Sequence, residues 1–302
     1  MRYRYVTVDV FTSRRFTGNP LAVFPDARGL DPDVMQRITR EFNLSETTFV
    51  LPPEDARHTR RVRIFTPGRE LPFAGHPTIG TAFALARLGE IPLAGDRTDV
   101  ILEEGVGPVP VSIFAKDGQP ASSCLTAARM PEIGPRPPGP YAIAAALSLD
   151  AGDLLGSPYE PEAVSCGVPF LFVPLRDRAA VARARLNRPE WERVLGTYWA
   201  AEIFFFAFDP ELPGSDLHAR MFAPRLGVLE DPATGSAVTA LGGYLGSRES
   251  QTDGALRWLV EQGFEMGRPS LLELEIEKRK GRVSEIRVGG PSVFVSEGAM
   301  EI

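Results

Sequence analysis

The hydrophobic pattern predicts two helices that are apolar on nearly every face, one in each half of the chain. The first covers residues 77–88 and carries Ile79, Phe83 and Leu85, and the second covers 234–246 and consists mainly of small residues. A helix at a protein surface shows only one apolar stripe, whereas a helix that is apolar all round is buried. We therefore expect each half of the chain to be built around a buried central helix.

Short strands are predicted around both helices, because alternating or continuous apolar runs lie between clusters of turn residues. Another helix is predicted to begin at Asp31-Pro32, with Asp31 as its N-cap, and further helical segments are expected near 178–186 and 189–196. The predicted strands lie at 3–11, 21–24, 47–51, 62–65, around 101, 111 and 125, at 170–174 and 201–208, around 221, and at 271–277, 283–288 and 292–296.

Three segments of the first half recur in the second half, in the same order and about half a chain apart. One such pair could arise by chance, but three pairs in register indicate a duplicated domain. The copies differ at one chemically important position, which is histidine in the first half and aspartate in the second. The pairs are His76–Ala82 with Asp231–Ala237, Arg63–Pro67 with Arg220–Pro224, and Gly18–Pro25 with Gly167–Pro174.

The length of 302 residues suits two domains of roughly 150 residues each. We expect an α/β (α+β) fold of two similar duplicated domains, each a β-barrel-like sheet around a central helix. The first repeat domain is predicted over residues 1–118, with 289–302 returning to it, and the second repeat domain over 119–288. A cleft between the two copies would present unlike groups to one small ligand.

The amino-acid composition limits the kinds of molecule that the protein is expected to bind. The 33 basic and 39 acidic residues give a net charge of -6, which argues against a nucleic-acid partner. The chain has neither a secretory signal nor an apolar run long enough for a membrane span, so we expect a cytoplasmic protein without membrane contact. Its two cysteines, Cys124 and Cys166, form no CxxC motif, and its three histidines lack zinc-ligand spacing, so no metal site is expected.

The two repeated helix starts are the strongest candidate site. His76 and Asp231 each precede a proline and then small residues, which predicts two helix N-termini. Such ends expose unpaired N–H groups and the positive end of the helix dipole, so two facing ends would bind a small carboxylate. Gly80 and Gly235 keep the following turns small, and Ser236 and Thr81 are candidate hydroxyl donors. Taken singly, Asp231 would be an ordinary cap and His76 a structural residue, and only the duplication favours a site.

Glu46 is a further candidate acid or base, in the loop that connects a predicted helix to a predicted strand. Its local sequence is equally typical of a capping or surface glutamate, and nothing in it shows that Glu46 approaches His76. His58 is expected on a solvated face, and His218 is expected to be structural.

Several motifs, taken together, resemble the PhzF-like family of phenazine biosynthesis, which has the diaminopimelate-epimerase-like fold. The resemblance extends from residue 1 to the C-terminus and is specific for the family, but less so for a substrate. The matching segments are Gly18–Pro20, Asn43–Val50, Arg63–Pro67, Glu70–Pro77, Glu230–Ala237 and Gln262–Ser270.

The resemblance implies a homodimeric isomerase that works without a cofactor, at a site between the domains. The best-known member isomerises trans-2,3-dihydro-3-hydroxyanthranilate on the way to phenazines. Related epimerases and racemases use two facing cysteines, which neither helix-start motif contains here, so carboxylate-centred proton transfer is expected. The family's residues carry over as catalytic Glu46, His76 and Asp231, with Ser45, Gly75, Gly235 and Ser236 binding the substrate.

The sequence leaves three functions open. The first is a cofactor-independent isomerase that moves a proton within a small cyclic amino-carboxylate, with Glu46 as base and then acid. The second is an isomerase or epimerase of the same family with an unrelated small acid as substrate. The third is a non-catalytic protein that binds a small acid, which the presence of Glu46 beside the anion site disfavours.

Overall fold

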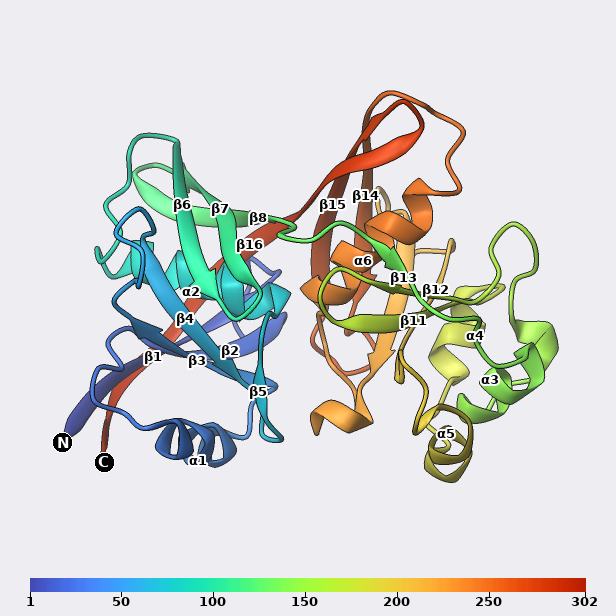
Figure 1. Ribbon diagram of the computed structural model, residues 1–302, viewed down its shortest axis with the longest axis horizontal. Helices are drawn as coiled ribbons and strands as arrows, with labels where there is room; N and C mark the ends of the chain where they lie inside the picture. Colours follow the sequence, from blue (N-terminus) through green and yellow to red (C-terminus); the bar gives the residue numbers. More distant parts are fainter.

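The computed structural model describes all 302 residues as two lobes, which are connected by one long strand and by residues 127–131 (Figure 1). Each lobe surrounds a central helix, α2 (Gly75–Arg87) in the first and α6 (Gly235–Gly246) in the second. The connecting strand β16 (Arg282–Glu301) pairs with β15 (Ser270–Arg279) in one lobe and with β1 (Arg2–Val10) in the other. The prediction of two separate final strands, at 283–288 and 292–296, was therefore wrong, because a single strand runs through both ranges.

The sheet of the first lobe closes into a barrel. Its strands follow the order β1-β2-β3-β4-β6-β7-β8-β16, and β16 pairs again with β1. The parallel pairing of β2 with β3 places Leu21 opposite Glu46, which brings the start of β3 beside the Gly18–Pro20 motif. The remaining elements of this lobe are β2 (Asn19–Phe24), α1 (Pro32–Phe42), β3 (Glu46–Leu51), β4 (Arg60–Phe65), β5 (Glu70–Leu71), β6 (Arg97–Glu104), β7 (Gly107–Lys116) and β8 (Gln119–Thr126).

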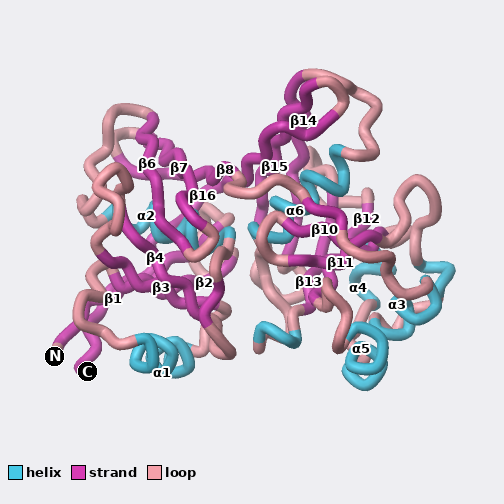
Figure 2. The backbone as a smooth tube through the Cα atoms, viewed as in Figure 1, coloured by secondary structure: helices cyan, strands magenta, loops and turns pink.

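The second lobe wraps its strands around α6 in the order β16-β15-β14-β13-β12-β11-β10-β9. The short helices α3 (Pro140–Ala146), α4 (Arg178–Arg183) and α5 (Arg188–Leu195) lie on the outer side of this sheet (Figure 2). Its remaining elements are β9 (Glu132–Ile133), β10 (Glu162–Ser165), β11 (Pro169–Pro174), β12 (Glu202–Ala207), β13 (Leu217–Phe222) and β14 (Gly254–Gln262), with 3₁₀ turns at Ala151–Asp153 and Pro224–Leu226.

Burial explains why both central helices are apolar on every face. In α2 every residue from Gly75 to Ala86 is buried, and Ile79 and Leu85 have no exposed surface. Burying one such side chain contributes about 1.5–3 kcal/mol to folding. By contrast, α1 lies outside the barrel and covers Phe24 and Phe49 with one apolar face. None of the helices combines the length and apolarity needed to cross a membrane.

The helix starts differ from the prediction by a few residues. The α2 helix begins at Gly75 with Ala74 as N-cap, so His76 lies within its first turn and Pro77 is not the first helical residue. Asp31 occupies the N-cap position of α1, but its side chain makes no capping hydrogen bond. Proline tolerates any of the first helical positions, so an X-Pro pair locates a helix start only approximately.

The domain boundary remains a proposal, and the strand pairing suggests moving it. β8 pairs with β7 between Val111 and Lys116, and Figure 1 shows it among the strands of the first lobe. We propose that the first domain extends through Thr126 rather than ending at residue 118. The part of β16 that pairs with β1 begins at Ser292, which agrees with a return of the chain to this domain.

Candidate active site

The N-terminal ends of α2 and α6 meet at two glycines, Gly75 and Gly235. A Cβ added to Gly75 would overlap the Gly235 carbonyl carbon and lie 2.5 Å from the Ser236 nitrogen. A Cβ added to Gly235 would lie 3.0 Å from the Gly75 Cα. Only glycine permits this approach of the two backbones. The approach brings the positive ends of two helix dipoles, and their unpaired N–H groups, to one place between the lobes.

A cavity of about 20 Å³ lies at this junction. That volume holds roughly one water molecule. Most of its wall is apolar and comes from both lobes, and none of the lining residues is lysine or arginine. The lining residues are Glu46, Leu71, Phe73, Ala74, Gly75, His76, Val168, Phe170, Met221, Ala223, Leu226, Val228, Asp231, Thr234, Gly235 and Ser236.

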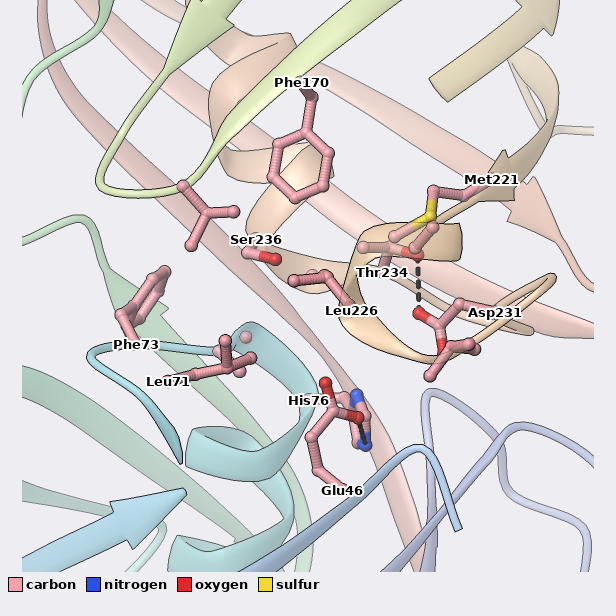
Figure 3. A pocket seen from close by; sticks show the side chains of 16 residues that line it. Glu46, Leu71, Phe73, His76, Phe170, Met221, Leu226, Asp231, Thr234 and Ser236 are labelled. Carbon is pink, nitrogen blue, oxygen red and sulfur yellow. Dashed lines mark hydrogen bonds and ion pairs between the residues drawn. The ribbon is translucent and has the colours of Figure 1, made fainter. Parts of the chain in front are cut away.

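Glu46 and His76 point toward each other at the edge of this cavity (Figure 3). The Glu46 Oε2 and His76 Nε2 atoms are 3.4 Å apart, and both side chains are buried. Neither atom has a hydrogen-bond partner within the protein. Buried polar atoms almost always have partners, so two unpaired atoms facing one cavity indicate a place for a ligand. The contact arises because α2 packs inside the barrel against the paired strands β2 and β3, and no local sequence signal predicts it.

Burial and hydrogen bonding act differently on the pKa values of the two carboxyl groups, Glu46 and Asp231. Burial raises the pKa of Glu46 well above its usual value, and the charge of Asp231 raises it further. Burial also raises the pKa of Asp231, but hydrogen bonds from Thr234, Asn19 and Ser45 limit this rise to about 6. Burial thus favours the protonated form of Glu46, whereas the hydrogen bonds to Asp231 favour its ionised form. Such a separation of two carboxyl pKa values is typical of acid–base sites.

Asp231 does not cap the second central helix, contrary to the prediction. The N-cap of α6 is Thr234, and the helix begins at Gly235. The Asp231 carboxylate instead accepts hydrogen bonds from Thr234 Oγ1 at 2.6 Å and from Asn19 Nδ2 at 2.8 Å. We therefore expect Asp231→Ala to lose stability through these bonds, one of which joins the two lobes, and not through loss of a helix cap.

Sequence reasoning assigned no role to two buried amides that support the site. Asn19 belongs to the Gly18–Pro20 motif and has no exposed surface, and its Nδ2 also donates to the Ala233 carbonyl at 2.8 Å. Gln262 donates from Nε2 to the Asp231 carbonyl and accepts from the Thr234 N–H through Oε1. Both residues lie in motifs that the chain shares with the family it resembles, and this sharing was the only sequence signal that pointed to them.

The predicted hydroxyl residues Ser236, Ser45 and Thr81 differ in where they lie relative to the cavity. Ser236 is half-buried at the start of α6 and lines the cavity, whereas Ser45 lies outside the lining and acts on the site by lowering the pKa of Asp231. Thr81 does not face the cavity, because its hydroxyl bonds to that of Thr48 at 2.8 Å inside the first lobe. The hydroxyl donor at the site is therefore Ser236 rather than Thr81.

The cysteines do not belong to the site. Neither Cys124 nor Cys166 lines the cavity, and burial raises their pKa values to about 11 and about 12. Thiols with such values stay protonated at neutral pH and are poor bases. No group of three or more histidine, cysteine, aspartate and glutamate side chains is placed to hold a metal ion.

The two other histidines show that the duplication extends further than the sequence indicated. His58 Nδ1 lies 2.7 Å from Glu103, which also accepts backbone N–H bonds from a neighbouring turn. In the second lobe His218 Nδ1 lies 2.9 Å from Glu261, which accepts two backbone N–H bonds in the same way. The His58 side chain is only 15% exposed, so its expected position on a solvated face was wrong.

Comparisons with known proteins agree with this architecture. The family model described as phenazine biosynthesis-like protein, PhzC-PhzF, matches residues 8–298. An uncharacterized isomerase of Mesorhizobium japonicum is 41% identical over 301 residues, covering 99% of this chain and 98% of that protein. The trans-2,3-dihydro-3-hydroxyanthranilate isomerase of Pseudomonas aeruginosa is 37% identical over 296 residues, covering 98% of each. The crystal structure of a PhzF-family phenazine biosynthesis protein from Bacillus anthracis superposes with a TM-score of 0.89 at 27% identity, covering 100% of both chains.

The fold, the cavity between the helix ends and these relatives define an α/β isomerase of the diaminopimelate-epimerase-like type. The chain belongs to the PhzC-PhzF family of phenazine biosynthesis-like proteins. The predicted fold class, family and enzyme class are thereby confirmed.

Proposed function

We propose that the protein isomerises a small cyclic amino-carboxylate of the trans-2,3-dihydro-3-hydroxyanthranilate class by moving one proton between two ring carbons. The observation that carries this proposal is the buried Glu46 carboxyl, whose unpaired oxygen faces His76 beside the two helix ends. The apolar wall suits an unsaturated ring. Unpaired N–H groups of Gly75, His76, Gly235 and Ser236 suit a single carboxylate, and they need no basic side chain.

Closure of the lobes controls the basicity of Glu46 in this proposal. The cavity of about 20 Å³ is too small for a substituted six-membered ring, so the lobes must part before the substrate enters. In the open, hydrated cleft the burial that raises the Glu46 pKa is relieved, so the carboxyl group ionises more readily. Closure then removes water and makes the carboxylate a much stronger base.

The proton transfer uses the same carboxyl twice. Glu46 Oε2 takes a proton from one ring carbon, so that a C–H bond breaks and an O–H bond forms while the electron pair spreads over the ring double bonds. The raised pKa lets Glu46 hold this proton inside the closed site. The O–H bond then breaks as a new C–H bond forms at another ring carbon. His76 and Asp231 hold the amino and hydroxyl groups, and the helix N–H groups hold the carboxylate.

A turnover assay with a substrate panel tests the function. The purified protein is expected to convert trans-2,3-dihydro-3-hydroxyanthranilate into an isomer of equal mass, followed by proton NMR. Proline and diaminopimelate, assayed in D₂O, are expected to show no enzyme-dependent deuterium uptake. Uptake into one of them, without conversion of the first compound, would favour the related isomerase with an unrelated substrate. Binding of the first compound without any turnover would favour the non-catalytic protein.

We also propose that the enzyme is a cytoplasmic homodimer that needs neither metal nor organic cofactor, and that its reaction belongs to phenazine biosynthesis. Support comes from the family resemblance and from a mechanism in which Glu46 performs the proton transfer itself. Light scattering that gave a monomeric mass would overturn the dimer. Loss of turnover after dialysis against a chelator would overturn the absence of a metal.

A further inference from the structure

The Asn19 side chain lies between His76 of its own lobe and two acceptors of the other lobe. Its Nδ2 atom is 3.0 Å from His76 Nδ1, 2.8 Å from Asp231 Oδ1 and 2.8 Å from the Ala233 carbonyl oxygen. The second lobe also holds the adjacent backbone, because Arg268 Nε donates to the Gly18 carbonyl at 2.7 Å. The orientation of the Asn19 amide therefore depends on contacts made across the cleft.

These contacts fix which end of the amide faces His76. If the amide were flipped, the Asn19 oxygen would face the Asp231 carboxylate and the Ala233 carbonyl, and two donor–acceptor bonds would become contacts between oxygens. The NH₂ group must therefore point toward all three neighbours. An amide NH₂ group has two hydrogens and only donates, so one hydrogen is shared between two of the three neighbours and His76 Nδ1 is an acceptor.

The tautomer of His76 follows from this contact. Burial lowers the pKa of His76 to about 3, so the ring is neutral at working pH and carries one proton. Because Nδ1 accepts a bond from Asn19, that proton is on Nε2. The Nε2–H then faces the cavity and Glu46 Oε2, 3.4 Å away. His76 thus presents a hydrogen-bond donor to the substrate, not a second base that would compete with Glu46.

We propose that Asn19 is a positioning residue that fixes His76 as the Nε2–H tautomer, and that it does so when the lobes are closed. Two of the three acceptors around its nitrogen belong to the second lobe, so opening the cleft frees the amide to rotate away from His76. Closure would then do two things at once, because it strengthens Glu46 as a base and turns a donor toward the substrate. The effect on turnover rests on the proposed function, whereas the tautomer does not.

Nitrogen-15 NMR of protein labelled in its histidine rings tests this proposal, with His76 assigned by comparison with His76→Gln. In the wild type, Nδ1 is expected to give the signal of an unprotonated ring nitrogen and Nε2 that of a protonated one. Asn19→Ala should produce a mixture of tautomers and lower kcat at least about tenfold, with a smaller change in KM. Asn19→Asp, which has nearly the same shape but only accepts bonds, should move the proton to Nδ1.

Thr81→Val is the matched control, because it removes a buried hydrogen bond beneath the same helix without contact to His76. It should leave both the tautomer and kcat unchanged. A wild-type His76 protonated on Nδ1 would overturn the proposal even if no Asn19 variant folded. An unchanged tautomer in Asn19→Ala would overturn it as well. If no substrate were turned over, the NMR result would still decide the role of Asn19, so failure of the proposed function would be seen separately.

Discussion

Replacing Glu46 by glutamine is expected to lower kcat by a factor of about a hundred or more while the fold stays intact. Glutamine keeps the size and hydrogen-bonding shape of the side chain, but it cannot accept the substrate proton. A positioned acid or base commonly contributes about 10²–10⁴-fold to a rate. The measurement is kcat and KM for trans-2,3-dihydro-3-hydroxyanthranilate, together with the unfolding midpoint of each protein.

Glu104→Gln is the matched control for Glu46→Gln. Glu104 lies in the same lobe, is buried, and has a pKa raised to about 8 by burial, but it does not line the cavity. Its Oε1 contacts the Thr78 hydroxyl at 2.6 Å, and an amide can preserve that contact. The control should therefore retain turnover. A wild-type kcat in Glu46→Gln would refute the assignment of Glu46 as the acid and base. An equal loss of kcat in Glu46→Gln and Glu104→Gln would mean that the loss is not specific to Glu46.

Gly75→Ala is expected to abolish most activity by holding the lobes apart. The added methyl group would lie 2.5 Å from the Ser236 nitrogen and would overlap the Gly235 carbonyl carbon, both in the other lobe. Backbone atoms at a helix start cannot yield as a flexible side chain could, so the two helix ends must separate. A displacement of about 1 Å at a reacting centre can cost roughly a hundredfold in rate, and we expect a loss of kcat/KM of at least about that size.

Gly139→Ala is the control for this substitution, because a Cβ at Gly139 meets no atom within 4 Å and its φ of -64° suits any residue. It should leave kcat/KM and the radius of gyration unchanged. Gly75→Ala should show a larger radius of gyration by small-angle scattering, with the circular dichroism of the wild type. Normal turnover in Gly75→Ala would show that the close contact of the helices is not needed.

The duplication predicted the main features of the fold. Both central helices were apolar on every side in the sequence, and both became the buried axes of the lobes. Periodicity also located most strands, since alternating apolar residues reflect which face of a sheet is buried. It divided β16 into two strands, because Gly289, Gly290 and Pro291 interrupt the pattern while the chain crosses between lobes.

Only those parts of the site that lie within a sequence motif could be predicted. Residues 76–82 and 231–237 mark the helix starts. Glu46 reaches His76 because α2 packs against the paired strands β2 and β3, and a single sequence does not show such long-range packing. Asn19 fills a gap between two lobes, so its partners lie more than 50 residues away and leave no local pattern. The cap expected at Asp231 failed for a related reason, since its partners come partly from the other lobe.

A titration of the Glu46 carboxyl in the closed protein tests the central claim most directly. The protein would be labelled with ¹³C at glutamate side-chain carboxyls and saturated with unlabelled anthranilate, and Glu46 would be assigned by its absence in Glu46→Gln. Burial and the Asp231 charge predict a midpoint well above the ordinary value of 4.5, and a lower midpoint in Asp231→Asn, where that charge is gone. A Glu46 midpoint at or below 4.5 with anthranilate bound would contradict the account.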